Sequence, residues 1–213
     1  PTRDEFGILE NVDQNGWKYQ RRRFDNANQL ITYLEQEGKL DTSTVEGFIF
    51  ARMMGFAGTI PGMVQKLGVV ISDRTPLSQK NTRGGYHKGV IFLNNKAFEG
   101  REDSASHVML HEGGHFIQDF MMGPGEALAI YSDILPDEES KKVSYAQYLL
   151  GRRVTSLAEL APDELSFVNR EFNKPGAQDT MVAEWTTQQM ALALASISGI
   201  TTTAEKLNPE IKK

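Results

Sequence analysis

The feature that most restricts the fold is a cluster of histidines inside an apolar segment that favours a helix. Three of the four histidines of the chain lie between residues 107 and 115, within the sequence SASHVMLHEGGHFIQDFMM. Asp103 or Ser104 can cap this helix, and the Gly-Pro-Gly sequence at 123–125 ends it. Apolar residues lie on most sides of the predicted helix, so we expect it to be central and buried.

The rest of the chain predicts an α+β fold that is mostly helical. A small sheet precedes the histidine-bearing helix, because the β-branched run at 69–73 and the apolar run at 86–94 have the composition of buried strands. Periodicity and capping residues also predict further helices. One begins at the capping box Ser43–Glu46 and a short one follows Pro61. The others cover residues 26–37, 126–134, 138–150, 163–172 and 179–198.

The N-terminal part is the least regular. Residues 1–24 are polar and mixed, with Gly7 and Gly16 as breaks, and they are predicted to form an arm or a weak hairpin. We therefore expect an N-terminal arm or helical extension over residues 1–40 and a single domain over residues 41–213.

Composition excludes several classes of site and partner. The chain has 213 residues and no cysteine, so disulfides, a cysteine nucleophile and thiolate metal ligands are excluded. Its 28 acidic residues outnumber its 23 basic ones, whereas nucleic-acid binders are usually basic, and we expect no nucleic-acid partner. No apolar run approaches the roughly 20 residues that cross a bilayer, so we expect no membrane partner.

Residues 111–115, HEGGH, match the pattern H-E-x-x-H on the predicted helix. His111 and His115 are four residues apart, so their rings lie one turn apart on one face and can bind one zinc ion at about 2.0–2.1 Å. Glu112 points around the helix and can reach a water molecule whose pKa zinc lowers toward ~7. It can take the proton of that water and return it to a leaving amine. The pattern therefore predicts a zinc-dependent peptidase with Glu112 as general base and acid.

Two glycines lie inside the motif, at positions 113 and 114. Each costs a helix about 0.8–1 kcal/mol relative to alanine. A close approach of another backbone or of a substrate would compensate for this cost. The alternative interpretation is a helix with surface histidines and a local kink.

The third ligand must be a carboxylate, because catalytic zinc uses three protein ligands and no histidine follows His115. We favour Glu184, in an apolar helical segment with Asp179 as its expected N-cap, because a charge buried there needs a partner or a metal. The alternative is that Glu184 faces water. Glu126 is the second choice, although a glutamate in a first helical turn also favours the helix dipole. The carboxylates considered are Glu126, Asp133, Glu138, Glu139, Glu159, Glu164, Glu171, Asp179 and Glu184.

In HEGGH, in the preceding strand YHKGVIFLNN and in the later segment AEWTTQQMALAL, the chain resembles the zincin metallopeptidases of the gluzincin type, over about residues 69–198. The resemblance implies a zincin-like fold and a protein or peptide substrate whose extended backbone pairs with the edge of strand 86–94. It also implies an oxyanion stabiliser, for which Tyr86 and His87 are the leading candidates and Tyr131 and Arg170 are further ones. The N-E-x-x-S-D signature of the best-known gluzincins is absent.

Similar small zincin domains occur within large polyvalent proteins of phages and mobile elements. On this resemblance we expect part of a longer polyprotein or of a virion assembly. Because the N-terminus also lacks the form of a signal peptide, we expect a cytoplasmic or virion-associated protein. A rival interpretation is a catalytically silent zincin-fold structural or binding protein, such as a virion component, although Glu112 is intact. Another is a metal-dependent hydrolase of a non-peptide bond.

Two further polar residues lie on nearly the same face of the predicted helix. His107 precedes His111 by four residues and is interpreted as a partly buried histidine with an ordinary hydrogen bond, or as a group that supports the ligands or the substrate. Asp119 follows His115 by four residues and either orients the other ring nitrogen of that ligand or is a surface acid.

Overall fold

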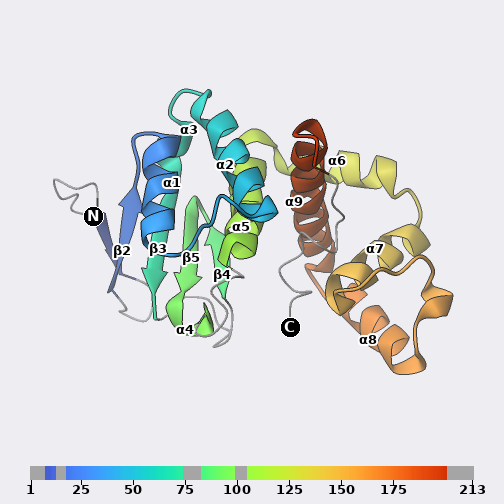
Figure 1. The fold of residues 1–213 in the computed structure, drawn as a ribbon. Coiled ribbons are helices and arrows are strands. Elements are labelled where there is room, and N and C mark those ends of the chain that lie inside the picture. Colours follow the sequence, from blue (N-terminus) through green and yellow to red (C-terminus); the bar gives the residue numbers. More distant parts are fainter. Residues whose placement is uncertain (1–7, 13–17, 74–82, 99–104, 201–213) are drawn as a thin grey trace. The chain divides into compact units, whose positions relative to one another are not determined.

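The computed structural model describes residues 8–12, 18–73, 83–98 and 105–200 (Figure 1). The chain divides into two compact units, Pro1–Phe120 and Met121–Lys213. The first unit combines a sheet with helices and the second is helical, so the α+β class with a small sheet and many helices is confirmed. None of the described helices is long and apolar enough to span a membrane.

The first unit is built on one five-stranded sheet with the strand order β1-β2-β3-β5-β4. Strands β3 and β5 are parallel, and the other neighbours are antiparallel. The strands are β1 (Ile8–Val12), β2 (Lys18–Arg23), β3 (Gly68–Ser72), β4 (Gly84–His87) and β5 (Val90–Asn94).

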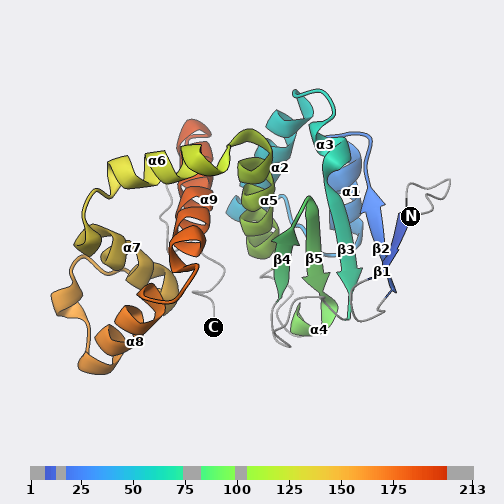
Figure 2. The same ribbon diagram turned by 180° about the vertical axis from the view of Figure 1, so that it is seen from behind.

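Helices α1 (Ala27–Gln36) and α2 (Val45–Gly58) lie on one face of this sheet, as Figures 1 and 2 show from opposite sides. The histidine-bearing helix α5 (Ala105–Met121) lies beside β4 and α2. Its expected caps, Asp103 and Ser104, lie outside the described residues. Helices α3 (Met63–Lys66) and α4 (Asn95–Phe98) are single turns.

Of the two predictions for residues 1–24, an arm or a weak hairpin, the structure confirms the hairpin. Strands β1 and β2 form an antiparallel hairpin, and β2 pairs with β3 through Arg22 and Arg23. Helix α1 then buries Leu30 and Leu34 completely. These backbone and apolar contacts join the segment to the first compact unit, whose division from the second lies after Phe120.

The predicted single strand over 86–94 is wrong, because the chain reverses at Lys88 and Gly89. Both residues have positive φ, 45° and 83°, and His87 pairs with Val90 on either side of them. A two-residue turn with positive φ at both positions is the hairpin turn that matches the twist of a sheet. The continuous apolar run that follows hides this turn in the sequence.

The start of α2 differs by one residue from the predicted capping box. The hydroxyl of Thr44, not that of Ser43, accepts the N–H of Gly47 at 3.1 Å. Ser43 instead donates its hydroxyl to Asp41 at 2.6 Å. The preceding turn therefore uses the serine, and the next hydroxyl residue caps the helix.

The described part of the second unit, up to residue 200, contains four α-helices and a short 3₁₀ turn, and the predicted helices are confirmed to within two residues at each end. Helix α9 begins after Gly176, whose φ is 80°, so Asp179 lies in the first turn and is not the N-cap as predicted. The elements are α6 (Pro124–Ile134), α7 (Glu138–Leu150), the 3₁₀ turn Leu157–Glu159, α8 (Pro162–Phe172) and α9 (Ala177–Ile197).

The packing of α2 generates a stability prediction. A Cβ atom at Gly47 would overlap the backbone carbonyl oxygen of Asp41. We expect Gly47→Ala to lower the free energy of unfolding by about 1–3 kcal/mol, because the backbone must move to accept the methyl group. Urea unfolding followed by circular dichroism measures the change.

Gly55→Ala is the matched control on the same helix, since a Cβ atom there meets nothing within 4 Å. This substitution should raise stability by up to about 1 kcal/mol through helix propensity alone. Equal stabilities of the two variants would contradict the close packing at Gly47.

Candidate metal centre

The two motif histidines face one another on α5. Their Nε2 atoms are 3.1 Å apart, and their ring planes are perpendicular with centroids 4.7 Å apart. Two nitrogen ligands on one tetrahedral zinc ion, each at about 2.0–2.1 Å, stand about 3.3 Å from each other. Both imidazoles are partly exposed. His111 and His115 are therefore arranged as two ligands of a single ion would be.

One of the two interior glycines has a packing role. A Cβ atom at Gly113 would lie 2.8 Å from Cε2 of Phe50, a ring that α2 buries completely. The compensation for this glycine is therefore the close approach of a side chain of α2, not of a backbone as we suggested. Gly114 is also buried.

Glu112 lies between the two histidines in the sequence and is 7% exposed. One residue along a helix turns the side chain by about 100°, so its carboxylate leaves the helix in a different direction from His111. The motif predicts that this buried carboxylate is the general base.

Glu184 lies on α9, and the packing of the second unit determines which way its helix faces within that unit. Met181 and Val182 are buried in a core with Tyr131 and Tyr145. Trp185 meets Tyr131 edge to face, with centroids 5.5 Å apart. Glu184 itself is partly exposed, while its Oε2 atom is buried, and its helix is apolar on the packed side, as expected.

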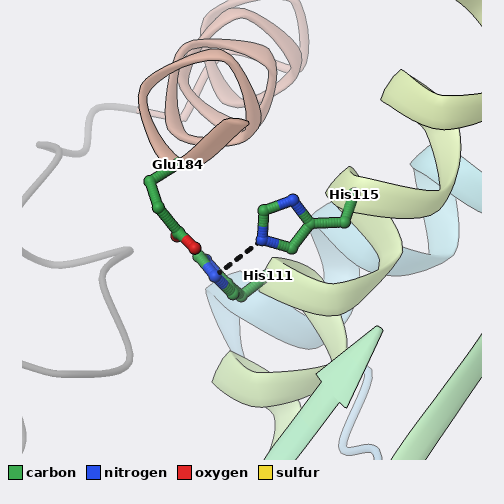
Figure 3. A group of neighbouring side chains, drawn as sticks. All are labelled: His111, His115 and Glu184. Carbon is green, nitrogen blue, oxygen red and sulfur yellow. Dashed lines mark hydrogen bonds between the residues drawn. The ribbon is translucent and has the colours of Figure 1, made fainter. Parts of the chain in front are cut away.

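Among the described residues, His111, His115 and Glu184 form a group that could hold a metal ion. One ligand atom can be taken from each so that all three lie within 4.8 Å of one another. Figure 3 draws these three side chains as sticks and marks the contact between the two imidazoles. Imidazole nitrogen and carboxylate oxygen both suit zinc, and two histidines with one glutamate form a known catalytic donor set.

Glu126, the second choice for the third ligand, has a different role. Its Oε2 atom accepts the backbone N–H of Gly123 at 3.0 Å and so caps the N-terminus of α6. The side chain is exposed. This contact matches the helix-terminal role that was weighed against metal binding.

The two leading oxyanion candidates lie on opposite faces of the sheet. Tyr86 pairs with Ile91, whereas His87 pairs with Val90, and neighbouring residues of a strand point to opposite sides. Tyr86 lies beside the H-E-x-x-H motif, with its ring stacked near His115 at a centroid distance of 6.5 Å. His87 is exposed on the other side.

The hydroxyl of Tyr86 is held by two hydrogen bonds. It donates to Oδ2 of Asp119 at 2.5 Å and accepts the N–H of Gly89 at 2.9 Å. The pKa of the Tyr86 phenol is raised above its ordinary value, with burial as the largest cause and the hydrogen bond to the carboxylate of Asp119 as the next largest. Asp119 is exposed, as a surface acid would be, but its carboxylate also accepts the hydrogen bond from Tyr86 of β4.

The remaining candidates lie in other surroundings. His107 is 1% exposed, so it is buried more deeply than the predicted partly buried histidine, and its Nε2 atom is 2.9 Å from Oε1 of Glu46 on α2. Tyr131 is buried in the core of the second unit. Arg170 is exposed on α8 and pairs with its neighbour Glu171.

No protein-family model, curated protein or solved structure matches the chain.

Tyr131, which packs against Trp185, generates a prediction on how the stability of the protein depends on pH. Burial raises the pKa of Tyr131 to about 12, from an ordinary value of 10.0. Between these two values the unfolded chain has lost the phenolic proton and the folded protein has kept it, so the unfolded state binds fewer protons. Stability therefore falls as the pH rises through this window.

Tyr131→Phe should make that fall shallower between pH 10 and pH 12, since the titrating group is gone. Urea unfolding of both proteins at stepped pH values measures the slope. Measurements from pH 7 to pH 9 are the control, because the phenol is then neutral in both states. Identical slopes above pH 10 would contradict the buried phenol.

Proposed function

We propose that the chain is a zinc-dependent peptidase of the zincin, gluzincin-like type, in which His111, His115 and Glu184 hold the metal. The observation that carries the proposal is the 3.1 Å separation of the Nε2 atoms of His111 and His115 on one helix, and Glu184 belongs to the same group of possible metal ligands. Two histidines and one glutamate leave a fourth position open for water or substrate, as catalytic zinc requires. The H-E-x-x-H spacing on α5 is independent support from the sequence.

Zinc, when bound, supplies the Lewis acidity that lowers the pKa of a water molecule toward ~7. Glu112 accepts the proton that this water loses while its oxygen attacks the carbonyl carbon of the peptide bond. The same carboxyl group then gives that proton to the amide nitrogen. The C–N bond breaks, and the products are an amine and a carboxylic acid, which keeps the second proton of the water and ionises at neutral pH.

The edge of the sheet supports a peptide substrate. Strand β4 is the last in the strand order, and the ring of one of its residues, Tyr86, is stacked near the ligand His115. A strand with a free edge binds an extended chain through main-chain hydrogen bonds, which suits the backbone of a peptide or unfolded segment.

Replacement of the proposed base tests the mechanism. Glu112→Gln should keep the zinc content of the wild-type protein while hydrolysis falls by about 10²–10⁴-fold, the usual contribution of a general acid–base group. Elemental analysis gives the metal content, and mass spectrometry of a digested peptide library gives the activity. Wild-type cleavage should also stop when a chelator removes the metal.

Glu126→Gln is the control, because that side chain is exposed and caps α6. It should cleave at the wild-type rate. Full activity of Glu112→Gln would remove this residue from the mechanism. Zinc binding by the wild-type protein without any turnover would instead favour a structural or binding protein.

Replacement of the third ligand tests the donor set. Glu184→Ala should weaken zinc binding by about 100-fold or more, since even the loss of groups behind a ligand costs 10–100-fold. Competition with a zinc-binding dye measures the affinity, and circular dichroism checks that the helices are intact.

Glu126→Ala separates the two candidate carboxylates. We expect wild-type zinc affinity in this variant, because its carboxylate is used in the cap of α6. Wild-type affinity in Glu184→Ala, with a loss in Glu126→Ala, would exchange their roles.

A further inference from the structure

The outer edge of β4 offers the backbone groups of two residues. His87 and Val90 flank a two-residue turn, so they form a hydrogen-bonded pair, and such pairs recur at every second residue. The N–H of Asn94, which donates to the carbonyl of Arg83 at 2.9 Å, fits this phase. Gly84 and Tyr86 therefore direct their N–H and C=O groups away from β5. Among the described strands, none pairs with this edge.

The side chain of Tyr86 joins the same edge to the helix that carries the motif. Its hydroxyl donates to Asp119 at 2.5 Å, and Asp119 lies one helical turn after His115 on α5. The ring of Tyr86 contacts Phe116 edge to face, with centroids 6.4 Å apart. One residue thus contributes backbone groups to the free edge and a charge-assisted hydrogen bond to the metal-binding helix.

This hydrogen bond changes the role expected for Tyr86. A phenol has one proton to donate, and Tyr86 donates it to Asp119. The oxygen also accepts the N–H of Gly89 in the hairpin turn. A hydroxyl bonded to the helix on one side and to the turn on the other is suited to holding β4 in place.

We propose that the Tyr86–Asp119 hydrogen bond positions the edge of β4 relative to the His111–His115 pair, and so sets the register of an extended peptide bound there. The inference rests on the proposed function for the nature of the bound chain. It makes Tyr86 and Asp119 positioning residues, which act on where the peptide lies and not on the metal or on proton transfer.

Register is a sensitive measure of such a role. A strand that slips by one residue turns all its side chains to the other face, so slips of two residues keep the pattern of contacts. When the positioning contact is lost, the peptide should bind more weakly and in more than one register. Cleavage should then appear at bonds two residues away from the main one.

The test uses the zinc-loaded protein and a peptide that the wild type cleaves mainly at one bond. Tyr86→Phe and Asp119→Ala should raise KM by about tenfold, the loss expected for one charge-assisted hydrogen bond. Both variants should also yield new products from bonds two residues away from the main cleavage site, with the zinc content unchanged. Mass spectrometry of the products gives the register.

Two further variants make the test specific. Asp119→Asn keeps an oxygen that can accept the hydroxyl of Tyr86, so it should restore most of the wild-type register. Tyr33→Phe removes a phenol from α1 and should leave the product pattern unchanged. Unchanged KM and an unchanged product pattern in Tyr86→Phe would overturn the inference.

A second readout does not need turnover. In Glu112→Gln protein, the same peptide should shift the backbone amide resonance of Gly84, and the shift should weaken when Tyr86→Phe is added. If the zinc-loaded wild type hydrolyses no peptide, the proposed function fails, while this loss of the Gly84 shift would still support the inference. A Gly84 shift that is equally large in both proteins would overturn it.

Discussion

The close packing of α5 against its neighbours is the constraint on which the proposed site depends. Gly84 on β4 has no side chain where Val108 of α5 approaches, and Gly113 has none where Phe50 of α2 approaches. The helix is therefore buried on these sides, and its residues 105–110 are all buried. His111 and His115 keep partial exposure on a helix that the core holds rigidly, so little conformational entropy remains to be lost when they bind a ligand.

Polar side chains recur every four residues along α5, and each has a different neighbour. His107 lies against the carboxylate of Glu46 on α2, and the rings of His111 and His115 contact each other. Asp119 accepts the hydrogen bond from the hydroxyl of Tyr86 on β4. Four residues turn a helix by about 400°, so this stripe drifts around the axis by about 40° at each step. Because of this drift, His107 at the start of the stripe faces α2, whereas Asp119 at its end faces the edge strand β4.

Local patterns predicted most of the helices but misplaced the features that long-range contacts decide. The helices of the second unit begin and end within two residues of the predicted bounds, because capping residues and prolines are local signals. The sequence predicts one strand over residues 86–94, because the continuous apolar residues after Gly89 hide the two-residue turn at Lys88 and Gly89. The composition of residues 1–24 predicts an arm or a weak hairpin, and only the structure shows that β1 and β2 form the hairpin and that β2 pairs with β3, far along the chain.

The sequence by itself determined the helix, the pairing of His111 with His115, the neighbouring carboxylate of Glu112 and the exclusion of thiolate ligands. These follow from helical geometry and composition, which act over a few residues. Only the tertiary structure decided that Tyr86 and not His87 lies beside His115. Such choices depend on strand register and on the packing of distant segments, and no local pattern in the sequence encodes them.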